Sequence, residues 1–254
     1  MPPDAVSTQC KARAGSTARR RNLAATLMAL ALAGVVLAWC RMLGYPGWEW
    51  HQKLTVEVET PNGVAVGSAV TEVHWRDELD LLADAPHVHS DVTGEAVVVN
   101  LGDDQYLFAL LSGAERLALR VFSDRRWPSD TDGLLPLIRD VSKQSKGASR
   151  PVEPAAYPRL VTFGDIDDPT SVRRVDPDNL AASFGHGYRL KSITLEITDA
   201  PVTNGELAKL FPWLDGNRID PNVNGGRSET LRYPNDSRRG YGTLSVDEFV
   251  RSRR

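Results

Sequence analysis

The clearest periodic signal in the chain is an alternation of apolar and polar residues over 53–60, where leucine and valine alternate with threonine and glutamate. A period of two places the apolar set on one face of a β-strand. Residues 61–63 (Pro-Asn-Gly) have the conformational freedom of a tight turn. We therefore predict a hairpin whose returning strand covers 64–75, in which Gly67 indicates a β-bulge.

Two further runs form a second predicted hairpin. Residues 95–101 and 105–111 are apolar on both faces, and a Gly-Asp-Asp turn lies between them. Such strands lie centrally in a sheet, with another layer covering each side. Apolar residues at helical spacing then predict a short helix over 114–120 and another over 132–143, where Pro136 is tolerated only near the first turn.

The composition changes at residues 143–158, which contain three prolines and no apolar period. We interpret this segment as a surface linker and as the place where two lobes would divide, if the body is not a single core. Alternation returns at 192–198, where a half-buried strand is predicted, and a shorter strand is expected over 159–163.

Local capping patterns indicate two helix starts. Asp176 followed by Pro177 is typical of an N-cap and a first helical residue, with the helix ending at the glycines of 185–187. Thr203 and Glu206 have the spacing of a capping box. Together the elements predict an α+β fold with a mixed, largely antiparallel sheet and short flanking helices, preceded by one transmembrane helix.

The transmembrane helix is predicted from an apolar run near the start of the chain. Residues 23–40 carry no charged side chain. As a helix this run spans roughly 27 Å, close to the hydrocarbon thickness of a bilayer. Arg19, Arg20 and Arg21 directly precede it, so the positive-inside rule keeps the N-terminus in the cytoplasm and sends the following residues across the inner membrane.

These signals divide the chain into three parts. Residues 1–21 form a disordered basic tail in the cytoplasm, 22–43 a signal anchor, and 44–254 a periplasmic α+β domain. Cleavage at small residues within the apolar run is the alternative to an uncleaved anchor. Three aromatic residues follow the anchor, as is typical of a membrane interface: Tyr45, Trp48 and Trp50.

Charge is unevenly distributed along the chain. Residues 1–44 carry six basic side chains and one acidic side chain, a balance of +5. Because the formal net charge of the chain is −3, the remainder carries −8. An acidic body lacks the basic surface that neutralises phosphates, so no nucleic-acid partner is expected. The sequence contains neither a P-loop nor a GxGxxG motif, and no cofactor is expected.

One short segment has the residue types of a metal site. His87, His89 and Asp91 stand at alternate positions, so an extended strand would project all three to one side, and His74 is a fourth candidate ligand. Solvated surface residues give the same pattern. The segment therefore supplies metal candidates but no assigned metal site.

Two other groups of residues allow a functional and a structural interpretation. The carboxylates within 165–168 suit a cation, but Asp168 before Pro169 is also typical of a helix N-cap, which we favour. Three aromatic residues suit a sugar or peptide platform, although core positions explain them better: Trp127, Tyr188 and Trp213.

Three blocks of sequence resemble an uncharacterised set of proteins from Gram-negative bacteria. They are WHQKLTVEVETPNG at 50–63, GEAVVVNLG at 94–102, and DIDDPTSVRRVDPDNLAASFG with SITLEITDAPVT within 165–203. The resemblance implies a single N-terminal membrane segment, a periplasmic body and a common fold. It implies no activity and no catalytic residue.

Two classes of function remain open from the sequence. The first is a non-enzymatic envelope protein, tethered by one helix, that holds an envelope protein or polymer near the membrane, where tethering raises the local concentration. The second is an anchored hydrolase acting on cell-wall or glycan material, because two carboxylates suffice for that chemistry. We favour the first, since no catalytic motif such as GxSxG is present in the exported body.

Overall fold

The computed structural model describes residues 28, 47–77, 88–168, 171–211, 230–232 and 243–252. The chain divides into two compact units, Met1–Pro46 and Gly47–Arg254. The predicted anchor and its flanking arginines lie outside the described residues, except for Met28. Among the helices that are described, none combines the length and the apolar character needed to cross a bilayer.

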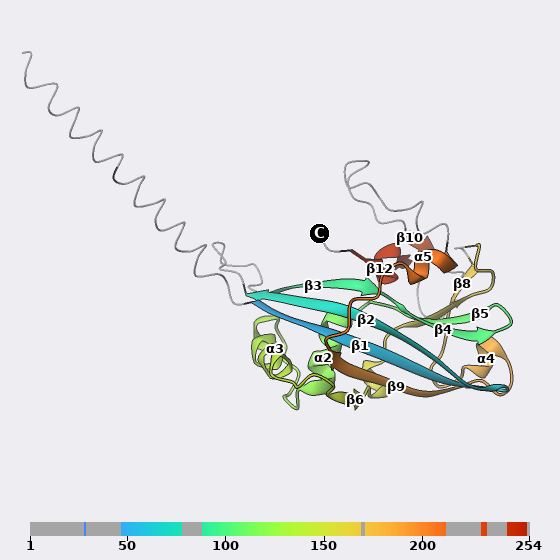
Figure 1. The fold of residues 1–254 in the computed structure, drawn as a ribbon, viewed down its shortest axis with the longest axis horizontal. Coiled ribbons are helices and arrows are strands. Elements are labelled where there is room, and N and C mark those ends of the chain that lie inside the picture. Colours follow the sequence, from blue (N-terminus) through green and yellow to red (C-terminus); the bar gives the residue numbers. More distant parts are fainter. Residues whose placement is uncertain are drawn as a thin grey trace, which may run out of the picture. The chain divides into compact units, whose positions relative to one another are not determined.

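A six-stranded antiparallel sheet dominates the second unit (Figure 1). Its strand order is β12-β3-β2-β1-β9-β6. The strands are bounded as follows: β1 Gly47–Thr60, β2 Gly63–Asp77, β3 Val88–Glu95, β6 Ser149–Pro151, β9 Arg189–Thr198 and β12 Val250–Arg251. The predicted first hairpin is confirmed, since β1 and β2 pair without interruption from Gly47–Arg76 to Thr60–Gly63.

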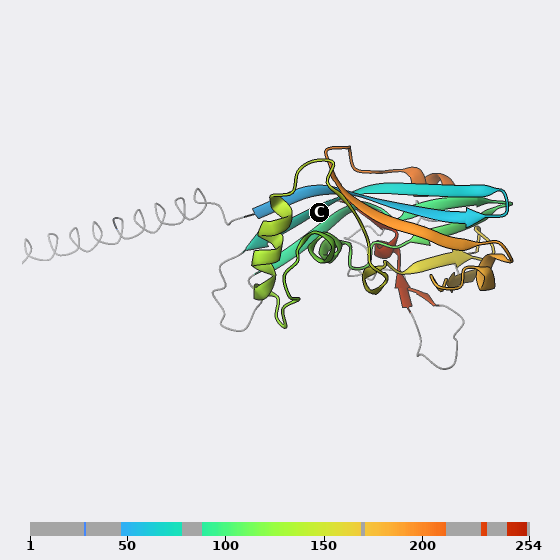
Figure 2. The same ribbon diagram turned by 90° about the horizontal axis from the view of Figure 1, so that it is seen from below.

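One face of this sheet is buried against two helices (Figure 2). They are α2 (Ala114–Phe122) and α3 (Leu135–Ser142), the latter preceded by the 3-10 turn η1 (Asp132–Leu134). Both were predicted, and Pro136 lies in the first turn of α3, where its missing N–H costs nothing. Leu117, Phe122 and Ile138 pack with Val73 and Trp75 of β2 in one core.

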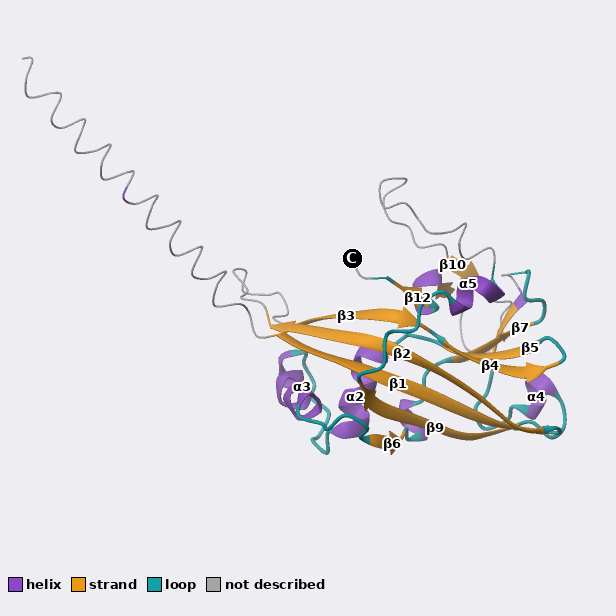
Figure 3. Cartoon of the chain, in the orientation of Figure 1, coloured by secondary structure: helices purple, strands orange, loops and turns teal. Residues whose placement is uncertain are grey.

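The second predicted hairpin belongs to a separate four-stranded antiparallel sheet (Figure 3). Its order is β4-β5-β7-β8, with β4 Val97–Gly102, β5 Gln105–Ala109, β7 Leu160–Phe163 and β8 Val172–Arg174. Asp103 and Asp104 form its turn with positive φ angles of 50° and 55°. As predicted, both faces of the hairpin are covered, because Val99 and Leu107 join the main core while Phe108 joins a second one. The predicted central position is correct for β5 but wrong for β4, which is an edge strand of this sheet.

Gly67 allows the two sheets to approach, and the predicted bulge is absent at this position. The β1–β2 register runs through Gly67 without a shift. A Cβ atom at Gly67 would lie 2.0 Å from the carbonyl oxygen of Val98 in β4, far inside van der Waals contact. The irregularity in this sheet lies instead at Glu57 and Val58, between β1 and β9.

The second core is built from aromatic residues on the other face of the small sheet. Phe108 packs against Phe211 at 5.1 Å between ring centroids, and against Phe163 and Phe249 at 5.6 and 6.2 Å. Phe211 directly follows α5 (Glu206–Leu210), and Phe249 directly follows the 3-10 turn η4 (Val246–Glu248). A short ribbon of β10 (Thr230–Arg232) and β11 (Thr243–Ser245) adjoins them.

Two of the predicted loop and helix boundaries are corrected. Segment 143–158 is not a plain linker, because it contains β6, the 3-10 turn η2 (Pro154–Ala156) and the buried Val152, whose N–H donates to the carbonyl of Ile193 in β9 at 2.8 Å. The helix predicted from Pro177 is shorter. Asp176 accepts a hydrogen bond from the N–H of Asp178 in a turn, and the helix α4 covers only Ala181–Phe184.

The fold class is α+β, with antiparallel sheets and a few short helices, as predicted. Local alternation and helical spacing identified most of the elements. The bounds that differ from the prediction are those of segment 143–158 and of α4.

Candidate functional site

The predicted histidine segment falls partly on β3. His87 lies outside the described residues, whereas His89 and Asp91 are exposed on the outward face of β3. His74 of β2 is the register partner of Asp91, and Arg76 is the partner of His89. The strands therefore bring His74, His89 and Asp91 onto the same face, as the alternate spacing predicted.

This arrangement gives no metal site among the described residues. A guanidinium nitrogen of Arg76 lies 3.1 Å from a carboxylate oxygen of Asp91, so the carboxylate already has a cationic partner. Within the described part of the chain, no group of three histidine, cysteine, aspartate or glutamate side chains is placed to hold a metal ion.

The aromatic residues predicted at the membrane interface divide between the two units. Tyr45 lies outside the described residues, whereas Trp48 and Trp50 are part of β1. Trp50 is only 5% exposed and belongs to the main core, where its indole N–H donates to the side-chain oxygen of Gln52 at 3.1 Å. Trp50 therefore stabilises the folded body rather than contacting lipid headgroups.

The other sequence candidates also have structural roles. The hydroxyl oxygen of Ser171 lies 2.7 Å from the backbone oxygens of both Asp165 and Asp168, and its O–H bonds to one of them, which closes the acidic segment into a set of turns. Trp127 and Tyr188 pack against the main core, as the structural interpretation predicted, and Trp213 lies outside the described residues. None of these residues forms a binding platform in the part of the chain that is described.

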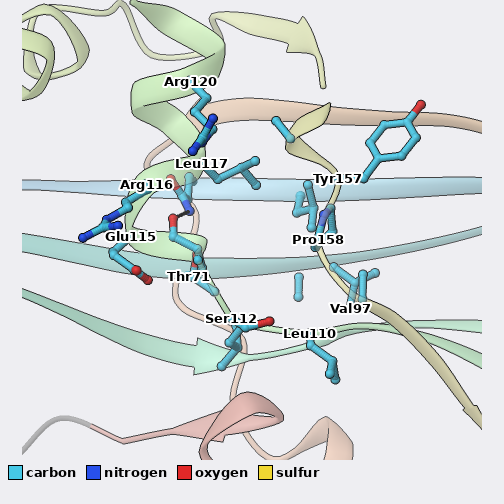
Figure 4. Close-up of a pocket in the computed structure, with 18 of the residues that line it drawn as sticks. Thr71, Val97, Leu110, Ser112, Glu115, Arg116, Leu117, Arg120, Tyr157 and Pro158 are labelled. Carbon is cyan, nitrogen blue, oxygen red and sulfur yellow. Dashed lines mark hydrogen bonds between the residues drawn. The ribbon is translucent and has the colours of Figure 1, made fainter. Parts of the chain in front are cut away.

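A cavity lies between α2 and the sheets (Figure 4). Its volume is about 300 Å³, at the lower end of the pockets that take small molecules. Four groups of residues line it: the inward-facing side chains of β1 and β2, the start of β4 with the preceding Glu95, the segment 109–120, and the segment 155–158. Its walls therefore come from parts of the chain that are distant in sequence.

The start of α2 is fixed by a buried glutamine on β1. Gln52 is 2% exposed, accepts from the indole of Trp50 and donates from its amide nitrogen to the carbonyl of Ala114 at 2.9 Å. Gly113 adopts a φ of 81° immediately before the helix, a left-handed conformation that suits glycine. Because both ends of the Gln52 amide are satisfied, this residue positions the helix and is not free to bind a ligand through those groups.

Glu95 is a buried carboxylate that is already committed to protein donors. Its side chain is 3% exposed and lines the cavity, but its carboxylate accepts the backbone N–H groups of Gly205, Glu206 and Leu207, the last two at 2.9 and 3.1 Å. The predicted capping box is therefore wrong. Thr203 accepts from the N–H of Val70 instead, and α5 is capped by a residue more than a hundred positions earlier.

Glu115 differs from Glu95 in having no such partners. It is half-buried in the first turn of α2, and its Oε2 atom is buried without a hydrogen-bond partner among the described residues. Folded proteins pair the great majority of such atoms, because a buried polar atom without a partner costs about 1–3 kcal/mol. Glu115 lines the cavity, but its Oε2 atom has almost no accessible surface, so this oxygen does not open into the cavity.

Two arginines of α2 line the same cavity at its exposed side. Arg116 and Arg120 are both exposed to solvent, unlike the buried Oε2 atom of Glu115. The guanidinium of Arg120 lies 4.0 Å from the ring centroid of Trp127, and this contact holds it against an aromatic face. The cavity therefore combines an apolar wall with cationic groups near solvent.

Comparisons of the chain with known protein families, with curated proteins and with solved structures find no match. The resemblance to the Gram-negative membrane-anchored proteins remains a prediction.

The sequence reasoning missed both glutamates of the cavity. Glu95 carries a recognisable signal, because it stands between Gly94 and the apolar run of β4, and a charge beside a buried run indicates a paired, buried carboxylate. Glu115 carries no such signal, since an acidic residue in the first turn of a helix is ordinary.

Proposed function

We propose that this chain is a membrane-anchored binding protein of the Gram-negative cell envelope, which holds a ligand in the cavity under α2. In this proposal residues 22–43 anchor the chain in the inner membrane with the N-terminus in the cytoplasm. The body that begins near residue 44 acts in the periplasm. The cavity, whose lining combines apolar and charged side chains from four parts of the chain, is the observation that supports binding.

The amino-acid sequence supports the anchor and its orientation. Residues 23–40 are uncharged and the arginines at 19–21 directly precede them, which is the arrangement that keeps a short basic tail in the cytoplasm. The proposal assigns the ligand-dependent role to the body, and the anchor serves to concentrate it at the membrane.

The hydrolase alternative would need two free carboxylates in one cleft. Glu95 and Glu115 both line the cavity, but Glu95 accepts three backbone hydrogen bonds from the start of α5. A carboxylate held in this way is not available to donate a proton or attack a substrate. The pair therefore favours binding over glycoside hydrolysis.

Site-specific photocrosslinking in living cells tests the binding function. We would introduce a benzophenone amino acid at Tyr157, which lines the cavity, and at Val66, which is 57% exposed on the β1–β2 hairpin, as a control. We expect a discrete adduct from position 157 that is lost when Ser112→Trp fills the cavity. Equal adducts from both positions, or an adduct unaffected by Ser112→Trp, would contradict the proposal.

A separate measurement tests the location. A reporter that is active only in the periplasm, fused after Arg254, is expected to be active, and the full-length chain is expected to stay with membranes during carbonate extraction. Activity of a cytoplasm-specific reporter at the same position would show that the proposed orientation is wrong.

A further inference from the structure

We infer that β2 pairs edge to edge with the β2 strand of a second copy of this chain, through residues 64–68. This inference concerns a different surface from the cavity and does not depend on the proposed ligand. It is argued from the backbone groups at the edge of the strand, from two exposed valines and from the charges beside them.

The direction of the backbone groups along β2 is fixed by one contact. In an antiparallel strand, alternate residues direct their N–H and C=O groups towards one neighbour and then towards the other. The N–H of Val70 donates to the hydroxyl of Thr203 at 2.9 Å, and the carbonyl of Val70 accepts the N–H of Thr203 at 3.0 Å. Val70 therefore points away from β1. Because the β1–β2 register has no shift, the even-numbered residues before it point to the same edge.

This edge carries no neighbouring strand over 64–68 in the described part of the chain. The strand β3 pairs with β2 only over 72–77, and Thr203 occupies the edge at Val70. Between Thr203 and the turn at 61–63, the outward backbone groups of residues 64, 66 and 68 have no hydrogen-bond partner among the described residues. In Figure 2 this strand, drawn in cyan, runs along the margin of the body.

The open edge lacks the features that prevent strands from pairing. Charged residues, proline and bulges protect the edges of natural sheets. Residues 63–71 contain no charged residue and no proline. Val64 and Val66 are 50% and 57% exposed, whereas the opposite face of the strand is covered by β4 at Gly67. An uncharged edge beside exposed valines is suited to the addition of another strand.

The limits of the edge favour a second copy of the same strand. The turn at 61–63 limits it on one side and Thr203 on the other, so Val66 lies at its centre. Antiparallel pairing about a two-fold axis at this point places Val66 opposite Val66 of the second copy, and Val64 opposite Ser68 of the second copy. The three outward residues of each strand then satisfy one another with six backbone hydrogen bonds.

The charges beside the edge permit this pairing. Glu57 and Glu59 of β1 are the register partners of the two valines, and uncompensated carboxylates at these positions would repel those of a second copy. Each carboxylate is already paired with a cation of β9. Lys191 lies 3.0 Å from Glu57, and Arg189 lies 2.7 Å from Glu59. Two copies therefore bring together valines flanked by compensated charges.

Cysteine cross-linking of the full-length chain in mild detergent tests the pairing and its register. In a background of Cys10→Ser and Cys40→Ser, Val66→Cys is expected to form a disulfide-linked dimer on mild oxidation. The α-carbons of directly opposite residues lie about 5.5 Å apart, within the range that a disulfide spans. Val64→Cys is a control of similar exposure, because position 64 lies roughly 13 Å from position 64 of the second copy. We expect Val66→Cys to cross-link at least about tenfold faster than Val64→Cys.

Two substitutions at one position test the backbone hydrogen bonds. Val66→Pro removes an outward N–H and leaves the hydrogen bonds to β1 in place. It is expected to weaken self-association of the full-length chain at least about tenfold in sedimentation equilibrium. Val66→Thr keeps the N–H and the β-branched shape, and we expect it to associate like the unmodified chain. Urea unfolding of both variants verifies that the body stays folded.

The outcomes are distinct from those that test the proposed function. A Val64→Cys chain that cross-links as fast as Val66→Cys, a chain that stays monomeric, or self-association unchanged by Val66→Pro would overturn the inference. Benzophenone at position 66 is expected to give an adduct of twice the chain mass that Ser112→Trp leaves unchanged. An adduct with an extended segment of another protein at position 66 would overturn the second copy as the partner. The adduct from position 157 alone decides the binding function.

Discussion

Removal of the Glu95 carboxylate is expected to destabilise the junction between the two sheets and α5. In Glu95→Ala the N–H groups of Gly205, Glu206 and Leu207 lose their common acceptor. Gly205 and Glu206 are partly or fully exposed, so their N–H groups can bind water, whereas Leu207 is completely buried. The main cost therefore falls on one backbone donor that water does not reach.

The magnitude follows from these three bonds. A buried donor without a partner costs about 1–3 kcal/mol, and a hydrogen bond to a charged group contributes about 1.5–3 kcal/mol. Burial of the ionised carboxylate offsets part of that gain. We expect Glu95→Ala to lower the free energy of unfolding by about 2–4 kcal/mol, a large share of the roughly 5–15 kcal/mol of a typical protein.

Urea unfolding followed by tryptophan fluorescence measures the change, and amide hydrogen exchange locates it. Exchange is expected to accelerate at 205–211, while β1 and β2 remain protected. Glu206→Gln is the control, because Glu206 is exposed and pairs only with Lys209 at 2.7 Å, a surface pair worth about 0–1 kcal/mol. A loss below about 0.5 kcal/mol in Glu95→Ala, with unchanged exchange at Leu207, would refute the assigned role.

Two further predictions concern the sheet contact and the response to acid. Gly67→Ala places a Cβ 2.0 Å from the Val98 carbonyl oxygen and is expected to lower the free energy of unfolding by at least about 1–3 kcal/mol in urea; wild-type stability would disprove the close approach. The Arg125 guanidinium, 2.7 Å from Asp140, lowers the pKa of that carboxyl below its usual value. The stabilisation of the folded state by this ion pair is present above the unfolded-state pKa of Asp140 and is lost as the pH falls through its folded-state pKa. Asp140→Asn is therefore expected to weaken the loss of stability below about pH 4, and an unchanged pH profile would contradict this.

Elements governed by local sequence were predictable. The β1–β2 hairpin follows from alternation and from the turn at 61–63, and α2 follows from apolar spacing over 114–120. These signals come from residues that are close in sequence, so they can be recognised without knowledge of the tertiary contacts. The same holds for the hairpin of β4 and β5, whose two apolar faces correctly indicated a layer on each side.

Features that depend on distant contacts were not predictable. The capping box at Thr203 failed because Glu95, far along the chain, supplies the acceptor for α5. Gly67 was interpreted as a bulge, but its role is to admit the backbone of β4. Local rules also cannot identify a cavity whose walls come from β1, β2, the start of β4, α2 and the turn η2. The sequence pattern of His89 and Asp91 was clear, yet the structure pairs Asp91 with Arg76.

Photocrosslinking in living cells from position 157 tests the central claim most directly, because it reports whether the cavity under α2 is occupied. The account predicts a discrete adduct from position 157 that Ser112→Trp abolishes, and no such adduct from the exposed control position 66. An adduct from position 157 that Ser112→Trp leaves unchanged, or equal adducts from both positions, would contradict the account.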